Sequence, residues 1–241
     1  MGKKPTIWQY GVTTVPSRLG VHLPDTLRSL AAAGFDAPIL FVDGFDGTEA
    51  YDALGCQVVY RRKPAIGAFG NWVLALWELY LRRRDATWFV IFQDDIRACA
   101  GLRDYLTHCS YPDKNAYYNL ITYPQNEQLV PDGLQHGWFK SNQNGLGAQG
   151  LMFSAEAVST ILSQDRLTRR PREAARWMAG IDGVACRAMR DGAKWTEYVH
   201  WPSLLDHVGV DGDTSIPRQQ KMPHRKQPKI TCYTGNPAAC P

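Results

Sequence analysis

An uninterrupted apolar run that ends in two adjacent carboxylates constrains the fold of this chain more than any other feature. Residues 88–92 read Trp-Phe-Val-Ile-Phe and lead through Gln93 to Asp94 and Asp95. Five bulky apolar residues without alternation predict a strand that is buried on both faces, as in a parallel sheet flanked by helices. Open α/β sheets bind ligands at the carboxyl ends of such strands. Because two like charges repel each other, the pair favours a bound cation and an anionic substrate. The alternative is a polar turn, with both aspartates in water or one of them capping the next helix.

Strand-like and helix-like segments alternate along the chain, and this alternation predicts the fold class. Strands are expected at 7–12, 39–42, 57–60, 88–92, 118–122, 195–201 and, after a glycine-rich stretch, within 145–153. Helices are expected from Pro24 to Gly34, from Asn71 to Arg84, around 102–106, after Ser154 and from Gly180 to Gly192. This alternation of strands and helices is typical of a doubly wound sheet. We therefore predict an α/β fold with a mixed, mostly parallel, Rossmann-like sheet flanked by helices.

Length and composition are those of one soluble globular domain. The 241 residues can bury one large core, and 44% apolar with 21% charged residues is ordinary for such a protein. We predict a single domain over residues 1–215 and a basic, proline-rich tail over 216–241. No signal-peptide core follows Met1 and no stretch reaches membrane-spanning length, so a cytoplasmic protein without membrane contact is expected. The sequence indicates no protein partner.

Positive charge is unevenly placed, although the net charge is only +4. Five arginines crowd residues 166–176, and five lysines and arginines follow one another in the tail between 218 and 229. Basic clusters of this kind suit a polyanion, whereas the alternative is a solvated surface.

Residues 124–144 are polar and rich in turn formers, and they surround Trp138 and Phe139. A loop of that length is more often functional than idle. It leads into the glycine-rich residues 145–150, where glycines allow a close approach of the backbone before a strand.

Several short motifs follow one another in a fixed order. They are Thr-Thr-x-Pro-x-Arg from residue 13, Gly-Asn at 70–71, Asp-Asp at 94–95, the glycine-rich segment at 145–150, Gly-Ile-Asp at 180–182 and Pro-Ser-Leu-Leu-x-His-Val-Gly from 202. Each motif is common alone, but the ordered set, over residues 6 to 215, resembles the GT-A glycosyltransferases. The resemblance implies a nucleoside diphosphate sugar as donor, with a UDP-sugar expected, and a divalent cation, Mn²⁺ or Mg²⁺.

The resemblance also implies a metal site. Asp95 is expected to bind the cation, and Asp94 to contact the ribose or the sugar. His207 is similar to the late metal ligand of some GT-A families, and an imidazole beside oxygen ligands suits Mn²⁺ better than Ca²⁺. The alternative for His207 is an ordinary core or surface histidine.

The donor nucleotide is expected to lie across the strand ends. The resemblance places Thr13, Thr14 and Arg18 near the base or the phosphates, and Asn71 near the ribose or the sugar. Arginine is a good anion donor, but a surface arginine is the usual alternative.

The resemblance places Asp182 at the position where inverting members of the family carry the general base. Removal of a proton by a placed carboxylate is typically worth about 10²–10⁴ in rate. The alternative is a helix cap beside Gly183. If Asp182 is the base, the anomeric configuration inverts.

The acceptor is expected to contact a set of residues near the glycine-rich segment and the arginine cluster. They are Trp138, Gly147, Gln149, Gly150, Arg169 and Arg170. The basic clusters favour double-stranded DNA, and 5-hydroxymethylcytosine offers a primary hydroxyl, so small soluble GT-A enzymes that glycosylate viral DNA are a reasonable comparison.

Other functions are compatible with the same residues. The acceptor could be a cytosolic glycan, a lipid-linked sugar or a protein. A non-catalytic nucleic-acid-binding protein explains the arginines but leaves Asp94, Asp95 and His207 without a role. A nucleotidyltransferase or nucleotide-sugar hydrolase also uses metal-bound carboxylates, but no glycine- and lysine-rich phosphate loop lies near the N-terminus.

Overall fold

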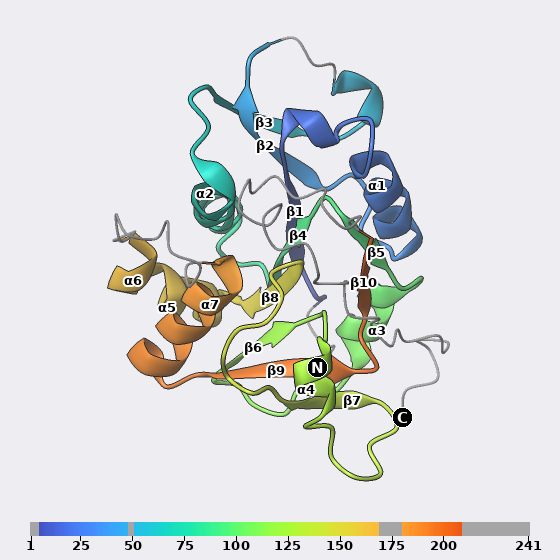
Figure 1. The fold of residues 1–241 in the computed structure, drawn as a ribbon, viewed down its shortest axis with the longest axis vertical. Coiled ribbons are helices and arrows are strands. Elements are labelled where there is room, and N and C mark those ends of the chain that lie inside the picture. Colours follow the sequence, from blue (N-terminus) through green and yellow to red (C-terminus); the bar gives the residue numbers. More distant parts are fainter. Residues whose placement is uncertain (1–4, 48–50, 169–179, 209–241) are drawn as a thin grey trace, which may run out of the picture.

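A mixed eight-stranded sheet forms the centre of the protein, with strands in the order β3-β2-β1-β4-β8-β6-β9-β7 (Figure 1). The computed structural model describes residues 5–47, 51–168 and 180–208. The strands are β1 (Trp8–Thr14), β2 (Ile39–Phe45), β3 (Val58–Arg62), β4 (Trp88–Gln93), β6 (Ala116–Asn119), β7 (Gly137–Lys140), β8 (Gly150–Ser154) and β9 (Thr196–Trp201). Strands β8 and β7 run antiparallel to their neighbours, and the other six share one direction. The predicted mixed, mostly parallel α/β fold is confirmed.

Strand β4 lies in the middle of this sheet, between β1 and β8. Its residues 89–92 have no exposed surface, which confirms the prediction of a strand buried on both faces. Phe89 and Ile91 belong to one apolar cluster, whereas Val90 and Phe92 belong to another. Because successive side chains of a strand point to opposite faces, β4 contributes to two cores at once.

Helices cover both faces of the sheet (Figure 1). The first cluster receives residues from α2 (Gly67–Arg82), α5 (Ala155–Leu162), α6 (Asp165–Thr168), α7 (Ile181–Arg187) and the π-helical turn η3 (Ala188–Ala193). The second cluster receives residues from α1 (Leu23–Ala32) and α3 (Leu102–His108). Two 3₁₀ turns, η1 (Pro16–Arg18) and η2 (Asp52–Leu54), complete this part of the chain. Among the described residues, no helix is both long enough and apolar enough to cross a membrane.

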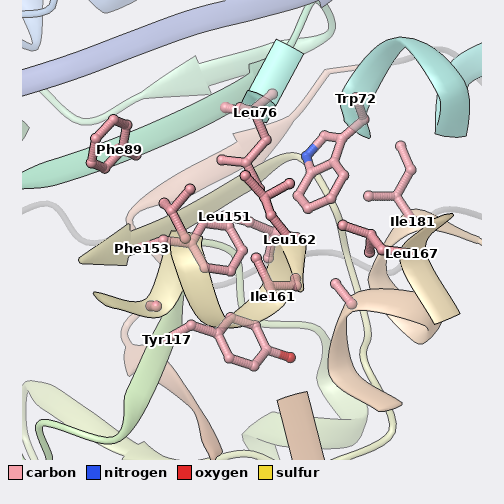
Figure 2. Packing of buried hydrophobic residues seen from close by; sticks show 14 of the residues in the cluster. Trp72, Leu76, Phe89, Tyr117, Leu151, Phe153, Ile161, Leu162, Leu167 and Ile181 are labelled. Atoms are coloured by element: carbon pink, nitrogen blue, oxygen red, sulfur yellow. The ribbon is translucent and has the colours of Figure 1, made fainter. Parts of the chain in front are cut away.

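Aromatic rings hold α2 against the sheet in the first cluster (Figure 2). The ring of Trp72 packs edge-on to Phe153, with ring centroids 6.1 Å apart, and Tyr117 stacks on the same phenylalanine at 5.4 Å. Leu76, Leu151 and other aliphatic side chains fill the space around them. Burying a ring of that size contributes several kcal/mol, roughly the 3–5 kcal/mol that its removal costs. This packing fixes the position of the α2 N-terminus, which lies near the ends of β2 and β3.

Helix α2 begins at Gly67, one turn earlier than the predicted start at Asn71. The cause is Asp43 in β2, whose two carboxylate oxygens accept hydrogen bonds from the backbone N–H groups of Ile66 at 3.0 Å and Gly67 at 2.8 Å. A carboxylate at a helix N-terminus satisfies free N–H groups and complements the helix dipole.

The polar stretch 124–144 is not the single irregular loop that its composition indicates. It contains the short helix α4 (Pro124–Glu127), and Trp138 and Phe139 lie in β7 at the edge of the sheet. The preceding strand β6 starts and ends earlier than the predicted 118–122. It ends at Asn119 because the side chain of this residue accepts the backbone hydrogen bond of Ile121 at 3.2 Å.

A separate two-stranded ribbon lies beyond the end of β4. Strands β5 (Ile96–Ala98) and β10 (Leu205–His207) pair antiparallel, and their register places His207 opposite Ile96. The backbone N–H of Val208 also donates to the carbonyl of Asp95 at 2.9 Å. The ribbon therefore brings a late part of the chain to the two aspartates.

Candidate functional site

Asp94 is a buried carboxylate immediately after β4, with 7% of its surface exposed. The Thr14 hydroxyl donates to its Oδ2 at 2.5 Å, and the Thr26 hydroxyl donates to its backbone carbonyl at 2.8 Å. Burial raises the pKa of Asp94 to about 6, and the negative charge of Asp95 adds to this effect. The hydrogen bond from Thr14 acts in the opposite direction. The two neighbouring carboxylates thus repel each other, as the sequence indicates.

Asp95 lies beside basic groups from two other elements. Its Oδ2 is 3.1 Å from Nε2 of His207 on β10 and 3.6 Å from Nη1 of Arg18 in η1. Burial alone raises the pKa of Asp95, but the His207 hydrogen bond and the charges of His207, Arg18 and His22 outweigh it and hold the pKa below its usual value. Asp95 therefore keeps its negative charge to a lower pH than Asp94 does.

The residues around Asp95 fit a divalent cation. The Oδ1 atom of Asp95 is buried and has no hydrogen-bond partner among the described residues, and His207 offers a ring nitrogen close by. No group of three or more His, Cys, Asp or Glu in the described part of the chain could hold a metal on its own. A cation here would have two protein ligands, with waters and phosphate oxygens as the others, which is how Mg²⁺ is commonly held beside phosphates. The nearby Arg18 opposes a cation but favours the phosphates that accompany it.

The four residues predicted to bind the donor are all buried, and their side chains make contacts within the protein. Thr14 and Arg18 lie against Asp94 and Asp95, as given above, and the Thr13 hydroxyl donates to the Phe92 carbonyl at 3.3 Å. The structure thus brings these three to the acidic pair.

Asn71 is placed elsewhere, next to β2 and β3. Its amide donates to the Phe41 carbonyl at 2.8 Å, and its Oδ1 accepts from Nε of Arg61 at 2.7 Å. The Arg61 guanidinium also lies over the Phe41 ring, 5.5 Å from its centroid. Asn71 therefore orients an arginine at the end of β3.

The sequence reasoning missed Arg61 and Asp43. Both stand at the ends of predicted strands, at 57–60 and 39–42. The signal that could have found them is that polar residues at the carboxyl ends of neighbouring parallel strands meet at one edge of a sheet.

Asp182 lies in the first turn of α7, where the N-cap position belongs to Gly180. Its Oδ2 accepts from the backbone N–H of Gly147 at 2.8 Å, and its Oδ1 from that of Gly183 at 2.9 Å. Burial raises the pKa of Asp182, and the backbone hydrogen bonds counteract part of the rise. The carboxylate is therefore oriented by a glycine-rich segment of the chain and is not the helix cap.

Residues 145–150 form a tight segment beside Asp182. Gly147 has φ +89°, and a Cβ there would lie 2.6 Å from side-chain atoms of both Ile121 and Tyr123, so only glycine fits. The Asn119 amide donates to the carbonyls of Leu146 at 3.0 Å and Gly147 at 2.8 Å. The segment is held from β6 on one side and from α7 on the other.

Gln149 and Gly150, both predicted acceptor residues, lie at the end of this segment. The Oε1 atom of Gln149 is buried without a hydrogen-bond partner among the described residues. At Gly150 an added Cβ would overlap the side chain of Leu205 on β10. The structure thus brings Gln149, Gly147 and Asp182 together.

Tyr123 is a residue of this site that the sequence reasoning did not identify. Burial raises the pKa of its phenol well above the ordinary value, and the negative charges of Asp182 and Asp95 raise it further. A hydrogen bond with Gln149 acts in the opposite direction. The ring of Tyr123 lies against Gly147, whose N–H donates to Asp182, and no local sequence pattern indicates this.

Trp138 packs within the second apolar cluster. Its ring stacks on Tyr111 with centroids 6.0 Å apart and meets Tyr118 and His200 edge-on at 4.9 and 5.1 Å. Stacking of this ring on an acceptor stays a prediction. Arg169, Arg170 and the tail 216–241 lie outside the described residues.

The fold, but no family, is identified by comparison with known proteins. No protein-family model and no curated protein sequence matches the chain. The structure is similar to a crystal structure of GalNAc-T7 with UDP, GalNAc and Mn²⁺, with a TM-score of 0.58 and 10% sequence identity over 85% of this chain and 44% of that chain. A second structure is that of a protein from Bacillus anthracis, provisionally assigned as a glucose-1-phosphate thymidylyltransferase, in complex with a sucrose. The TM-score is only 0.46, with 14% sequence identity over 90% of this chain and 95% of that chain. This chain spans less than half of the GalNAc-T7 chain, and the first likeness supports the predicted GT-A-like α/β fold.

Proposed function

We propose that the protein is a metal-dependent glycosyltransferase that moves a sugar from a nucleoside diphosphate sugar to an acceptor hydroxyl. The observation that carries the proposal is the buried Oδ1 of Asp95, which has no hydrogen-bond partner among the described residues and lies beside His207 at the carboxyl end of the central strand. A structure of similar fold holds UDP, GalNAc and Mn²⁺, so we expect a UDP-sugar as donor and Mn²⁺ or Mg²⁺ as cation.

Asp95 and His207 would hold the cation, and Asp94, fixed by Thr14, would face the ribose or the sugar. A divalent cation held there would supply Lewis-acid stabilisation of the negative charge on the departing diphosphate. Arg18, whose guanidinium is 3.6 Å from Asp95, would add a fixed positive charge near the same phosphates.

Asp182 would act as the general base. Its two backbone hydrogen bonds orient the carboxylate, and a raised pKa makes it a better proton acceptor. The acceptor oxygen forms a bond to the anomeric carbon while its proton passes to Asp182. The bond from that carbon to the diphosphate oxygen breaks, with the electron pair remaining on the diphosphate. Attack on the face opposite the leaving group inverts the anomeric configuration.

For the acceptor we propose 5-hydroxymethylcytosine in double-stranded DNA. The basic clusters at 166–176 and 218–229 support this choice, because lysines and arginines bind phosphates in a salt-dependent way. A glycan, a lipid-linked sugar or a protein is the alternative acceptor.

The test is release of nucleoside diphosphate in the presence of Mn²⁺. Common sugar nucleotides would be combined with plain DNA, with hydroxymethylcytosine DNA or with no acceptor. Asp95→Ala is the site variant, and Asp104→Ala, at an exposed position on α3, is the matched control.

Release that requires the modified DNA, disappears in Asp95→Ala and persists in Asp104→Ala is the expected result. Slow release without any acceptor that is lost only in Asp95→Ala would retain the glycosyltransferase and reject the DNA acceptor. If no donor is bound or turned over, a nucleic-acid-binding protein without activity becomes the better description.

A further inference from the structure

We infer that Asn119 is a positioning residue that orients Asp182 through one peptide unit of the glycine-rich segment. The inference rests on the proposed function, in which Asp182 is the general base. It is carried by a continuous path of hydrogen bonds from the end of β6 to the first turn of α7. Asn119 belongs to none of the ordered sequence motifs.

The peptide unit between Leu146 and Gly147 links the two side chains. Its carbonyl, that of Leu146, accepts a hydrogen bond from Nδ2 of Asn119 at 3.0 Å. Its N–H, that of Gly147, donates to Oδ2 of Asp182 at 2.8 Å. A peptide unit is planar, and its carbonyl and N–H point in opposite directions, so a bond that fixes one end also fixes the direction of the other. Asn119 therefore determines where the Gly147 N–H points.

The backbone at Gly147 needs this support. Gly147 has φ +89°, and glycine adopts positive and negative φ about equally readily, so the preceding peptide unit can turn over. Turned over, it would place the Leu146 carbonyl oxygen against the Asp182 carboxylate, where two acceptors repel each other. Asn119 also donates to the Gly147 carbonyl at 2.8 Å, which restrains the following peptide unit. Its amide thus favours one orientation of the backbone on both sides of Gly147.

The orientation of the Asn119 amide is itself fixed. The residue has no exposed surface, and its Oδ1 accepts from the backbone N–H of Ile121 at 3.2 Å. Oε1 of Glu197 lies 3.4 Å from Nδ2. Exchanging the amide oxygen and nitrogen would place an oxygen against two carbonyls and a carboxyl group, and an NH₂ group against an N–H. Only one orientation satisfies all four contacts, and it presents both donors to the glycine-rich segment.

The N–H that Asn119 orients affects both the direction and the proton affinity of Asp182. Together with the Gly183 N–H, which donates to Oδ1 at 2.9 Å, it fixes the plane of the carboxylate. Both hydrogen bonds also lower the pKa of Asp182 against the effect of burial. A base fixed in one plane accepts a proton from one direction, which is what positioning contributes to a rate. Loss of the Asn119 amide should therefore loosen Oδ2 of Asp182 and raise the pKa.

The experiment follows the titration of Asp182 by NMR in protein labelled with ¹³C at the aspartate γ-carboxyl groups. The signal is assigned by its absence from Asp182→Asn. Asn119→Ala removes the amide, and Asn119→Ser, which retains one shorter donor, serves as a second variant in case the first does not fold. Asn126→Ala is the matched control, because Asn126 is equally buried and its Oδ1 accepts from the backbone N–H of Asn142. Release of UDP from UDP-sugars is measured in parallel, with Mn²⁺ and hydroxymethylcytosine DNA.

In Asn119→Ala we expect the pKa of Asp182 to rise, because one hydrogen bond to the carboxylate is weakened. The kcat should fall about tenfold while the KM for the donor stays the same, the usual effect of one lost hydrogen bond in the reacting site. Asn119→Ser should show smaller changes in the same directions. Asn126→Ala should lower the stability but leave the Asp182 titration in place. Arg187 and Glu197, whose charges also act on Asp182, are present in every variant.

Two results would overturn the assignment, and they differ. If Asp182 titrates in the folded Asn119 variants as it does in the unchanged protein, or is shifted equally in Asn126→Ala, Asn119 does not act on this carboxylate. If the unchanged protein releases no UDP, or Asp182→Asn releases it equally fast, the proposed function fails. The role of Asn119 then fails with it, whatever the titration shows.

Discussion

Glu197 should make the stability of the protein depend on pH in a way that one substitution removes. The side chain lies in β9 with 1% of its surface exposed. Its Oε2 accepts from the Ser141 hydroxyl at 2.6 Å, and its Oε1 is 3.4 Å from the Asn119 amide nitrogen. Burial raises the pKa of Glu197 from 4.5 to about 7, and these hydrogen bonds offset only part of that effect.

The sign follows from proton binding. The folded protein keeps a proton on Glu197 at pH values where the unfolded chain has released it. Because the folded-state pKa is the higher one, the stabilisation is fully present below pH 4.5 and is lost as the pH rises through about 7. A change from 4.5 to about 7, at about 1.4 kcal/mol per pKa unit, amounts to about 3 kcal/mol.

Glu197→Gln carries no ionisable group and should escape this loss. Relative to the unchanged protein, its free energy of unfolding should rise by about 3 kcal/mol between pH 4.5 and about pH 8. The glutamine oxygen can keep the Asn119 hydrogen bond, but its NH₂ group then faces the Ser141 hydroxyl, which already accepts from Gln143, and this should cost about 1 kcal/mol at every pH. The variant is thus expected to be less stable than the unchanged protein in acid and more stable in base.

Urea unfolding followed by tryptophan fluorescence at several pH values measures the effect. Glu156→Gln, at an exposed position on α5, is the matched control and should show no pH-dependent difference. The reasoning is refuted if the difference between Glu197→Gln and the unchanged protein is the same at all pH values.

Three further predictions concern single side chains. Gly147→Ala should lower the free energy of unfolding by about 2–4 kcal/mol, because the positive φ is strained for alanine and the new methyl group would overlap Ile121 and Tyr123. Gly133→Ala is the control: it has φ +82° but open space around it, and should cost only about 1–2 kcal/mol. Thermal unfolding measures both changes. His207→Ala should weaken Mn²⁺-dependent UDP binding at least about tenfold without lowering the Tm by more than a few degrees, and equal affinity in titration calorimetry would contradict its role as a ligand. Trp72→Ala should cost about 3–5 kcal/mol in urea unfolding, whereas Trp77→Ala, at 36% exposure on the same helix, should cost much less.

The central strand and the acidic pair could be predicted from the sequence because burial leaves a direct pattern there. Residues 88–92 are apolar without interruption, and a strand that packs on both faces requires this. The carboxylates that follow such a strand must lie at its carboxyl end. Ser154 likewise caps α5, because its hydroxyl oxygen accepts a hydrogen bond from the backbone N–H of Ala157, and this depends only on neighbouring residues.

What could not be predicted depends on contacts between distant residues. The start of α2 is set by Asp43, more than twenty residues before it, so the local pattern placed the start at Asn71. Trp138 lies in a short edge strand whose flanking residues are polar, and it pairs with β9 about sixty residues later. Tyr123 joins the site only because Gly147 leaves room for its ring.

The ribbon of β5 and β10 has a consequence for the order in which the protein is assembled. As a ribosome releases the chain, the first four strands of the sheet and both aspartates emerge long before His207, which is 112 residues after Asp95. A nascent chain can therefore form its central strands while the site at their ends is still half built. Under the proposed function, affinity for a nucleotide should therefore arise late and abruptly, when β10 docks on β5.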